Sequence, residues 1–324
     1  MRALVTGAGG FLGGALVRQL LARGDDVAAV VRHIAGATDL ATAGCELVQL
    51  DLAADDPSAL VQALRGRDAL FHLAGSYRIG IPGSQRAQMY EANVAATRNI
   101  LDAADAAGIE RIIYTSTGNV LGDTAGHAPD ESYRRPQPAR FLSYYDETKY
   151  LAHRLVEERV AAGAPVLVAM PGMVYGPGDH SQAGAQILRA MAGRLGIVAG
   201  ADLGGNLVHV DDVAAGHLLI HDAGQVGRAY LLGGERARMG EVLKRAAALG
   251  GHQLPRLGVP SWLLRGIAPL GDAAAALSDR IANFGELVRA GTGVTYWFSD
   301  ARARSELGYA PRDLDAGLRT LLPA

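Results

Sequence analysis

The sequence predicts an α/β fold in which a doubly wound parallel sheet is joined to a smaller C-terminal lobe. The first residues read as a short apolar strand, a glycine-rich turn and a helix. Four more apolar runs alternate with helical segments, as strands buried on both faces do; they are residues 27–31, 47–50, 69–71 and 111–115. The chain of 324 residues exceeds the size at which one hydrophobic core stops growing. We therefore expect a main domain over residues 1–175 and a lobe over most of residues 176–324, with some segments returning to the main domain.

The composition is that of a soluble globular protein. Hydrophobic residues make up 49%, but no apolar run approaches the roughly 18 residues that a membrane span needs, and no signal-peptide pattern precedes the first strand. We therefore expect a cytoplasmic protein with no membrane partner. The formal net charge of −2 gives no reason to expect a nucleic-acid partner. The single cysteine, Cys45, excludes an internal disulfide.

The turn after the first strand has the spacing of a dinucleotide-binding loop. Gly7, Gly10 and Gly13 follow that strand, with Phe11 and Leu12 between the last two glycines, and a helical pattern begins directly afterwards. Glycines let the backbone approach a pyrophosphate, and the N-terminus of the helix offers free N–H groups and the positive end of its dipole. This turn predicts a cofactor site of the Rossmann type over the first domain.

The end of the second strand bears on the choice of cofactor. An acidic residue there selects NAD by binding the ribose 2′-hydroxyl, whereas an arginine accommodates the 2′-phosphate of NADP. This chain has Arg32 directly after Val31, with His33 next. The pattern favours NADP, and NAD stays the alternative in which Arg32 is a solvated loop residue.

Residues after the third and fourth strands complete the expected cofactor site. Asp51 and Leu52 form a polar and apolar pair that is placed to flank an adenine ring. Leu73, Ala74 and Gly75 are small or apolar residues that would let the cofactor lie over a strand end. We interpret His72, just before them, as a core histidine satisfied by hydrogen bonds rather than as a catalytic group.

A tyrosine and a lysine four residues apart suggest proton transfer. Tyr145 and Lys149 fall on one face of a helix, so the ammonium group can lie close to the phenol and lower its pKa. Tyr145 would then be a usable general acid or base. The hydroxyls of Ser116 and Thr117 follow the strand of residues 111–115, at the edge where open parallel sheets bind ligands.

In their order and separations, these motifs resemble the extended short-chain dehydrogenases/reductases, the NAD-dependent epimerase/dehydratase family. Further matching segments extend the resemblance over nearly the whole chain: Asn93-Val94, residues 170–179, residues 207–213, residues 231–235 and residues 299–309. Within the family, the chain resembles the branch of dihydroflavonol reductase-like enzymes and hopanoid-associated sugar epimerases.

The resemblance implies roles for individual residues. Thr117 would be the catalytic hydroxyl, with Ser116 as the alternative, Tyr145 would be the acid or base, and Lys149 would also hold the nicotinamide ribose. Pro171 and Met173 would be further cofactor contacts. The resemblance also implies a homodimer that is joined through the helix near Asn93 and the helix of Tyr145.

Two features favour a carbonyl reductase over a sugar-nucleotide epimerase or dehydratase, which is the alternative. Met170 stands where many sugar-nucleotide enzymes of the family have an arginine, and Arg32 favours NADP, the usual cofactor of net reduction. An epimerase would need a basic cluster for the substrate diphosphate, and Arg189 and Arg194 are the candidates.

The C-terminal lobe should close over a small-molecule substrate. Candidate substrate contacts follow strand ends or lie in the lobe: Tyr77, Arg78, Asn119, Tyr144, Met173, Tyr175 and Trp262. Apolar residues around Ile197, Leu203 and residues 262–270 predict a largely hydrophobic pocket. His217 and His221 are one helical turn apart, but we interpret them as a solvated helix face and expect no metal site.

Overall fold

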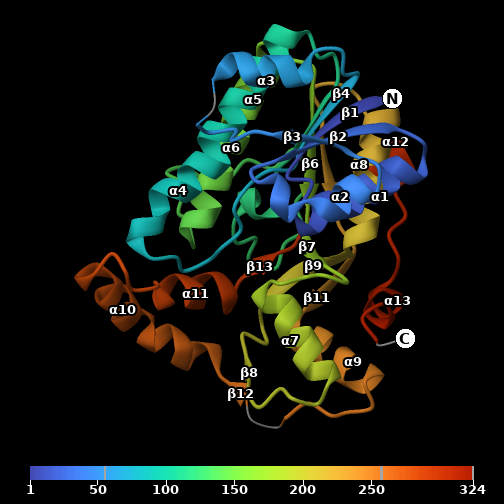
Figure 1. Cartoon of the computed structure of the whole chain (residues 1–324). Helices are drawn as coiled ribbons and strands as arrows, with labels where there is room; N and C mark the ends of the chain where they lie inside the picture. The colour runs from blue at the N-terminus through green and yellow to red at the C-terminus, as the bar shows by residue number, and fades with distance from the viewer. Residues whose placement is uncertain (55, 256–257, 323–324) are drawn as a thin grey trace.

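The computed structural model describes residues 1–54, 56–255 and 258–322. Figure 1 shows an α/β domain in the upper part of the view and a smaller lobe below it. Chain segments cross between the two parts several times, so neither part is a single continuous stretch of sequence. The α/β fold class expected from the sequence is confirmed.

The main domain is built on a seven-stranded parallel sheet with the strand order β10-β6-β5-β4-β1-β2-β3. Its strands are β1 (Arg2–Thr6), β2 (Asp26–Val31), β3 (Glu46–Gln49), β4 (Ala69–His72), β5 (Ile112–Thr115), β6 (Val166–Pro171) and β10 (Ala229–Leu232). The order reverses between β1 and β4, so the strand ends on either side of this point open into a crevice where such sheets bind ligands. β10 comes from the C-terminal half of the chain and completes the edge of the sheet.

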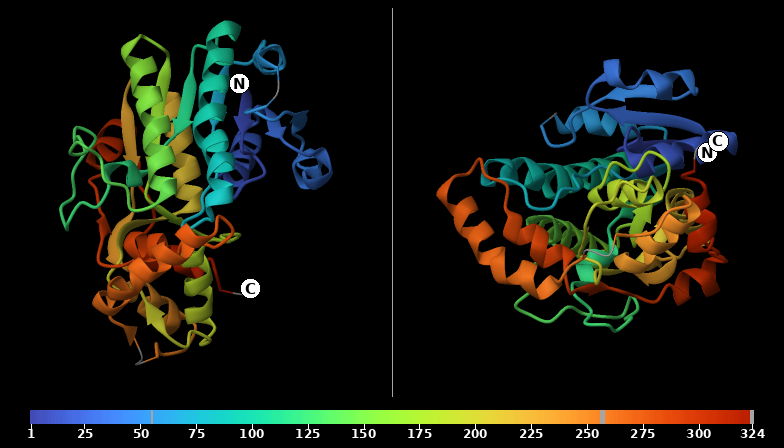
Figure 2. Two further views of the ribbon diagram at one scale, coloured as in Figure 1. Left: turned by 90° about the vertical axis from the view of Figure 1, so that its left-hand side faces the viewer. Right: turned by 90° about the horizontal axis from the view of Figure 1, so that it is seen from below.

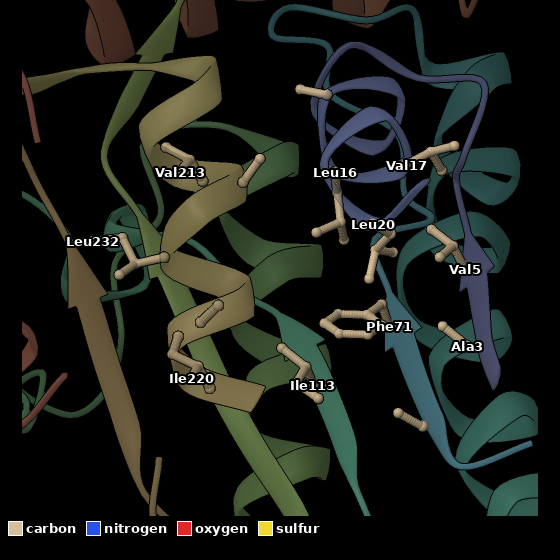
Figure 3. Packing of buried hydrophobic residues seen from close by; sticks show 14 of the residues in the cluster. Ala3, Val5, Leu16, Val17, Leu20, Phe71, Ile113, Val213, Ile220 and Leu232 are labelled. Atoms are coloured by element: carbon tan, nitrogen blue, oxygen red, sulfur yellow. The ribbon is translucent and has the colours of Figure 1, made fainter. Parts of the chain in front are cut away.

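Helices cover both faces of this sheet because its strands are apolar on both sides. On one face lie α1 (Phe11–Ala22), α8 (Val210–Ala223) and α12 (Ala301–Leu307), and on the other lie α3 (Pro57–Leu64), α5 (Ala96–Ala107) and α6 (Tyr144–Ala161). Alternate strand residues serve the two cores: Val5 packs with the first set of helices and Leu4 with the second. Figure 3 shows the first core, where residues of α1 and α8 lie over strand residues, among them Phe71 and Ile113.

One long helical segment carries a π-helical turn. α4 (Arg86–Tyr90), the π turn Glu91–Ala95 and α5 follow one another without a break. This segment packs beside α6, and the left view of Figure 2 shows the two standing upright next to each other. Because π turns often occur at functional sites, the position of Asn93 in this one is of interest.

The lobe has its own sheet and core. Its main strands are β7 (Met173–Tyr175), β9 (Gly204–His209), β11 (Glu235–Arg238) and β13 (Thr295–Tyr296), with β8 (Val198–Ala199) paired to β12 (Gly258–Val259). Its helices are α7 (Gln182–Met191), α9 (Met239–Leu249), α10 (Ser261–Leu277), α11 (Phe284–Gly291) and α13 (Leu314–Arg319); the short α2 (Thr38–Thr42) belongs to the main domain. α10 and α11 pack against each other at one side of the lobe (Figure 1).

Candidate active site

The turn between β1 and α1 leaves no room for side chains at two of its glycines. A Cβ on Gly7, whose φ is +72°, would lie 2.7 Å from the backbone nitrogen of Ala74, and a Cβ on Gly13 would lie 2.0 Å from the carbonyl oxygen of Gly7. A Cβ on Gly9, in contrast, would meet nothing within 4 Å. α1 then begins at Phe11 without a side-chain N-cap, so no capping side chain takes up its first N–H groups. This geometry fits the pyrophosphate of a dinucleotide.

Arg32 lies at the carboxyl edge of the sheet, next to this turn. It directly follows β2, and β2 pairs with β1 so that Val30 is opposite Thr6. Its side chain is exposed and forms no ion pair or side-chain hydrogen bond with the part of the chain that the structure describes. Asp51 and Leu52 follow β3 at the same edge, with Asp51 exposed and Leu52 buried.

The end of β4 is held by two hydrogen-bonded groups. The imidazole of His72 lies 2.7 Å from Oγ1 of Thr6 and 3.0 Å from Oγ1 of Thr97, and burial lowers its pKa to about 3. The interpretation of His72 as a satisfied core residue is thus confirmed. Asn93, in the π turn, accepts a hydrogen bond from the backbone N–H of Ser76 at 2.6 Å. The segment of Leu73, Ala74 and Gly75 is therefore fixed at both ends.

Tyr145 lies in the first turn of α6 and is buried. The hydroxyl of Ser143 caps this helix by accepting a hydrogen bond from the N–H of Asp146 at 3.2 Å. The ring of Tyr77 packs edge-on against the ring of Tyr145, with 4.8 Å between their centroids. Thr117 is close enough for its hydroxyl to form a hydrogen bond with Tyr145. The structure thus brings Thr117 and Tyr145 together.

Lys149 lies one turn further along α6 and is also buried. Its Nζ donates a hydrogen bond to the carbonyl oxygen of Thr115 at 2.9 Å, and it lies 5.3 Å from the ring centroid of Tyr114. Burial lowers the pKa of this ammonium group to about 8. The side chain is therefore held at the end of β5, beside Thr117.

The expected lowering of the tyrosine pKa by Lys149 is wrong for the protein on its own. Burial raises the pKa of Tyr145 well above its ordinary value, the charges of Tyr77 and Asp146 add to this increase, and the hydrogen bond with Thr117 offsets only part of it. The physical reason is that desolvation penalises a buried phenolate more than nearby groups stabilise it. Tyr145 is therefore protonated at neutral pH.

These side chains line a cavity of about 720 Å³ between the main domain and the lobe. Among the predicted cofactor, catalytic and substrate residues, those that line it are Phe11, Leu12, Leu73, Gly75, Tyr77, Ser116, Thr117, Asn119, Tyr145, Lys149, Pro171 and Met173. The lobe contributes apolar side chains to the opposite wall, among them Leu203, Leu264, Leu287 and Val288. The segment that leads into α7 and the start of that helix add polar side chains: Asp179, His180, Ser181, Gln182 and Gln186. The wall formed by the lobe is therefore apolar beside α10 and α11 and polar beside α7.

Four of the seven predicted substrate residues do not line this cavity: Arg78, Tyr144, Tyr175 and Trp262. Tyr175 is buried in the core of the lobe, where its hydroxyl donates to the carbonyl oxygen of Leu314 at 3.3 Å. Trp262 lies on α10 and is 74% exposed. Neither assignment as a substrate contact is supported. Tyr144 instead stacks on the guanidinium group of Arg86.

The interpretation of His217 as part of a solvated helix face is wrong. It is fully buried rather than solvated, its Nδ1 lies 2.8 Å from the carbonyl oxygen of Val213, and its Nε2 lies 2.9 Å from Oγ1 of Thr115. The pKa of His217 falls to about 4 because of burial. The residue thus anchors the strand whose carbonyl group holds Lys149.

Among the groups that sequence reasoning missed are Tyr296, which lines the cavity, and Asp146, which is next to Tyr145 but outside the lining. Tyr296 is buried on the short strand β13 and lines the cavity, but it belongs to no motif that marks it. Asp146, beside the catalytic candidate, is buried and accepts a hydrogen bond from Nδ2 of Asn119 at 3.2 Å. Desolvation raises the pKa of this carboxyl group to about 6. The capping pattern from Ser143 to Asp146 was the only signal for it.

The doubly wound sheet and its glycine turn define the dinucleotide-binding class of α/β protein. Over residues 3–233, the chain matches the model of the NAD dependent epimerase/dehydratase family, and it belongs to this family. None of the helices in the described ranges has both the length and the apolar character needed to cross a bilayer.

Two relatives show the kind of enzyme. A 2-alkyl-3-oxoalkanoate reductase of Stenotrophomonas maltophilia is 31% identical, over 99% of this chain and 98% of that protein. Sterol demethylase protein B of Methylococcus capsulatus is 34% identical, over 84% of this chain and 81% of that protein. With the family match, such relatives identify an NAD(P)-dependent oxidoreductase of the extended short-chain dehydrogenase/reductase type.

Solved structures agree on the fold. The crystal structure of gox2253 has a TM-score of 0.83 at 31% identity, covering 99% of this chain and 96% of that chain. MoeE5, in complex with UDP-glucose and NAD, has a TM-score of 0.75 at 26% identity, covering 99% of this chain and 97% of that chain.

Proposed function

We propose that this protein is an NADP(H)-dependent oxidoreductase that reduces a ketone or aldehyde, or oxidises the corresponding alcohol by the reverse hydride transfer, acting on a small to medium, largely hydrophobic substrate. The observation that carries the proposal is the cavity, which places a buried Tyr145 and Thr117 opposite apolar side chains of the lobe. Among the described residues that line it, Lys149 is the only lysine or arginine. A relative named for reducing an oxo group on an alkyl chain supports the same substrate class.

Tyr145 has the protonation state that reduction requires. Because its pKa is raised by burial, its phenol keeps the proton at neutral pH and can donate it to a carbonyl oxygen as that oxygen gains charge. The bound cofactor would supply the hydride. Thr117, whose hydroxyl lies beside Tyr145, would donate a second hydrogen bond to the developing oxyanion.

Lys149 acts on Tyr145 after the proton has left. Its ammonium group is fixed one helical turn from Tyr145 by the hydrogen bond to the carbonyl oxygen of Thr115, at the edge of the same cavity. A cation so placed stabilises the phenolate that remains, although it does not set the pKa of the free protein. Removing the charge of Lys149 would therefore slow the proton transfer more than it would weaken substrate binding.

Several chain segments would hold the cofactor. The turn of Gly7, Gly10 and Gly13 would bind its pyrophosphate, and Leu73 to Gly75, Pro171 and Met173 would lie against its nicotinamide half. Asp51 and Leu52 would flank the adenine. Arg32, exposed beside the glycine turn, would pair with a 2′-phosphate, which is the basis for proposing NADP rather than NAD. A homodimer and a cytoplasmic location remain predictions of the sequence.

A sugar-nucleotide epimerase is the second candidate, because MoeE5 binds UDP-glucose on the same fold. The cavity argues against it. Arg189 and Arg194, the expected diphosphate ligands, are exposed and do not line the cavity, and no other arginine among the described residues does. A nucleotide diphosphate would then be desolvated without a guanidinium partner.

The test is NADPH oxidation with carbonyl probes. Purified protein is mixed with NADPH and with 2-octanone, acetophenone or ethyl acetoacetate, and absorbance is followed at the nicotinamide band. We expect oxidation that depends on the probe and increases with its apolar size. The proposal fails if no probe is reduced while UDP-glucose is converted to another sugar nucleotide without a change in NADPH.

A further inference from the structure

The side of the catalytic cavity that α7 forms has no role in the proposed reaction. Gln182 and Gln186 lie on this helix, and both line the cavity. They are four residues apart, so their side chains lie one above the other on the same face of the helix. α7 therefore places two amide groups in a row along the space in which a substrate would bind.

Neither amide group has a partner within the protein. Gln182 is exposed and Gln186 is half-buried, and the side chain of each forms no hydrogen bond with any of the described residues. Each amide has two N–H donors and one carbonyl oxygen that accepts. A ligand that displaces water from these groups must replace the hydrogen bonds of that water, because an unpaired polar group costs free energy.

The start of α7 lies close to the reaction centre. A Cβ on Gly178, four residues before Gln182, would lie 3.9 Å from the ring of Phe11, with which α1 begins. Gln182 and Phe11 line the same cavity as Tyr145. A substrate whose carbonyl group lies at Tyr145 can therefore reach the two amides without leaving the cavity.

Asp179 limits the charge that this side of the cavity accepts. Its side chain is nine-tenths buried and lines the cavity. Oδ1 accepts a hydrogen bond from the N–H of Ser181 at 2.8 Å, whereas Oδ2 has no hydrogen-bond partner among the described residues. No lysine or arginine of α7 lines the cavity to offset this carboxylate. An anionic group beside the two amides would therefore be repelled.

The side of the cavity that α10 and α11 form is different. Leu264 of α10, with Leu287 and Val288 of α11, gives it an apolar surface. These two helices lie on a different side of the lobe from α7 (Figure 1). A single cavity thus offers uncharged hydrogen-bonding groups on one side and apolar side chains on the other. The substrate that fits it has two ends of different polarity.

We propose that Gln182 and Gln186 determine specificity by hydrogen bonding to an uncharged, hydroxyl-bearing end of the substrate, whose apolar end lies against α10 and α11. The inference rests on the proposed function and narrows its substrate class to carbonyl compounds with one alkyl or aryl end and one hydroxylated end. A hydroxyl group can accept from an amide N–H and donate to an amide carbonyl oxygen. Asp179 discriminates against a carboxylate or phosphate in the place of the hydroxyl group.

Three ketones with the same hexyl group test the inference: 2-octanone, 1-hydroxy-2-octanone and 4-oxodecanoate. We expect the parent protein to have its highest kcat/KM with 1-hydroxy-2-octanone. Gln182→Met and Gln186→Met remove the amide but keep an unbranched side chain that favours a helix. Each should lower kcat/KM for 1-hydroxy-2-octanone about three- to tenfold, mainly through KM, and leave that for 2-octanone within about twofold. Ala185→Met, at an exposed position of α7 outside the lining, is the matched control and should change neither value.

Asp179→Asn tests the exclusion of anions. Asparagine keeps an oxygen that can accept from the N–H of Ser181 but removes the negative charge. This variant should have a higher kcat/KM for 4-oxodecanoate than the parent protein has. An unchanged value, or a parent protein that prefers 4-oxodecanoate to 1-hydroxy-2-octanone, contradicts the inference.

The outcomes distinguish this inference from the proposed function. If the two glutamine variants lower kcat/KM for 2-octanone and 1-hydroxy-2-octanone by the same factor, or weaken the binding of NADPH, the amides do not recognise the hydroxyl group, and the reductase assignment stands. If no ketone is reduced, the proposed function fails. Binding of 1-hydroxy-2-octanone in the presence of NADP⁺, measured by saturation-transfer NMR, tests the amides without turnover, and equal binding by parent and variants overturns the inference.

Discussion

At the scale of residues, burial is what sets the chemistry of Tyr145. Its position four residues before Lys149 could be read from the sequence, and so could its location at the crevice. The sequence could not show that desolvation would outweigh the lysine, because the degree of burial depends on Tyr77, Ile81 and Met89, which are distant from Tyr145 in the sequence. Tyr175 was misassigned for the same reason, since burial cannot be read from the sequence. It lies at the end of strand β7, as a site residue could, but its side chain is buried in the core of the lobe.

We predict that Tyr145→Phe lowers kcat by about 10²- to 10⁴-fold, because it removes the proton donor without changing the shape of the cavity. The affinity for NADPH, measured by fluorescence titration, should stay within about twofold of that of the parent protein. Tyr144→Phe is the matched control, since Tyr144 is the neighbouring residue on α6 and lies outside the cavity lining. A loss of similar size in the control would show that any change at the start of this helix disturbs the site.

At the scale of elements, the strand ends and the turns between strand and helix were the most predictable parts. Glycines at positions 7 and 13 are required because a Cβ there would collide with backbone atoms. This requirement produces a glycine spacing that can be recognised in the sequence. The elements of the lobe have sequence patterns that are harder to recognise. β13 has two residues and α10 exposes most of its apolar side chains, so Tyr296 was missed and Trp262 was wrongly placed.

His72 joins three elements, and its titration gives a prediction about stability. The folded protein holds the pKa of His72 at about 3, against 6.5 for a free histidine, because the ring is buried between Thr6 of β1 and Thr97 of α5. Below pH 6.5, His72 binds a proton in the unfolded chain but stays neutral in the folded protein. Stability is therefore lost as the pH falls from about 6.5 toward 3, by about 1.4 kcal/mol per pH unit for this residue.

The variant His72→Asn tests this slope. It should be less stable than the parent protein at pH 7.5, and the difference in the free energy of unfolding should shrink as the pH falls to 5.5. Urea denaturation followed by circular dichroism measures both proteins. His127→Asn, at an exposed loop position, serves as the control and should leave the slope unchanged. Parallel slopes for His72→Asn and the parent would rule out His72 as the source.

At the scale of the whole molecule, the site exists because two parts of the chain meet over it. The main domain supplies the glycine turn and the Tyr145 helix, and the lobe supplies a wall that is apolar beside α10 and α11 and has no described arginine. Family motifs made the first part predictable, since their spacing is constrained by the cofactor. The residues of the lobe depend on the substrate instead, and the sequence carries no motif for them. The sequence therefore predicted only that apolar residues around Leu203 and residues 262–270 would form a hydrophobic pocket, and Leu203 and Leu264 do line the cavity.

The cofactor measurement tests the central claim, net reduction with NADPH, most directly. The purified protein is first checked by absorbance for bound nicotinamide and is then titrated with NADPH and NADH by fluorescence. We expect empty protein that prefers NADPH, with Arg32→Glu losing about ten- to a hundredfold in NADPH affinity, as the loss of a charge-assisted hydrogen bond implies. The control Arg65→Glu, at an exposed position directly after α3, should lose none. Tightly retained NAD, with no effect of Arg32→Glu, would contradict the account and favour epimerisation.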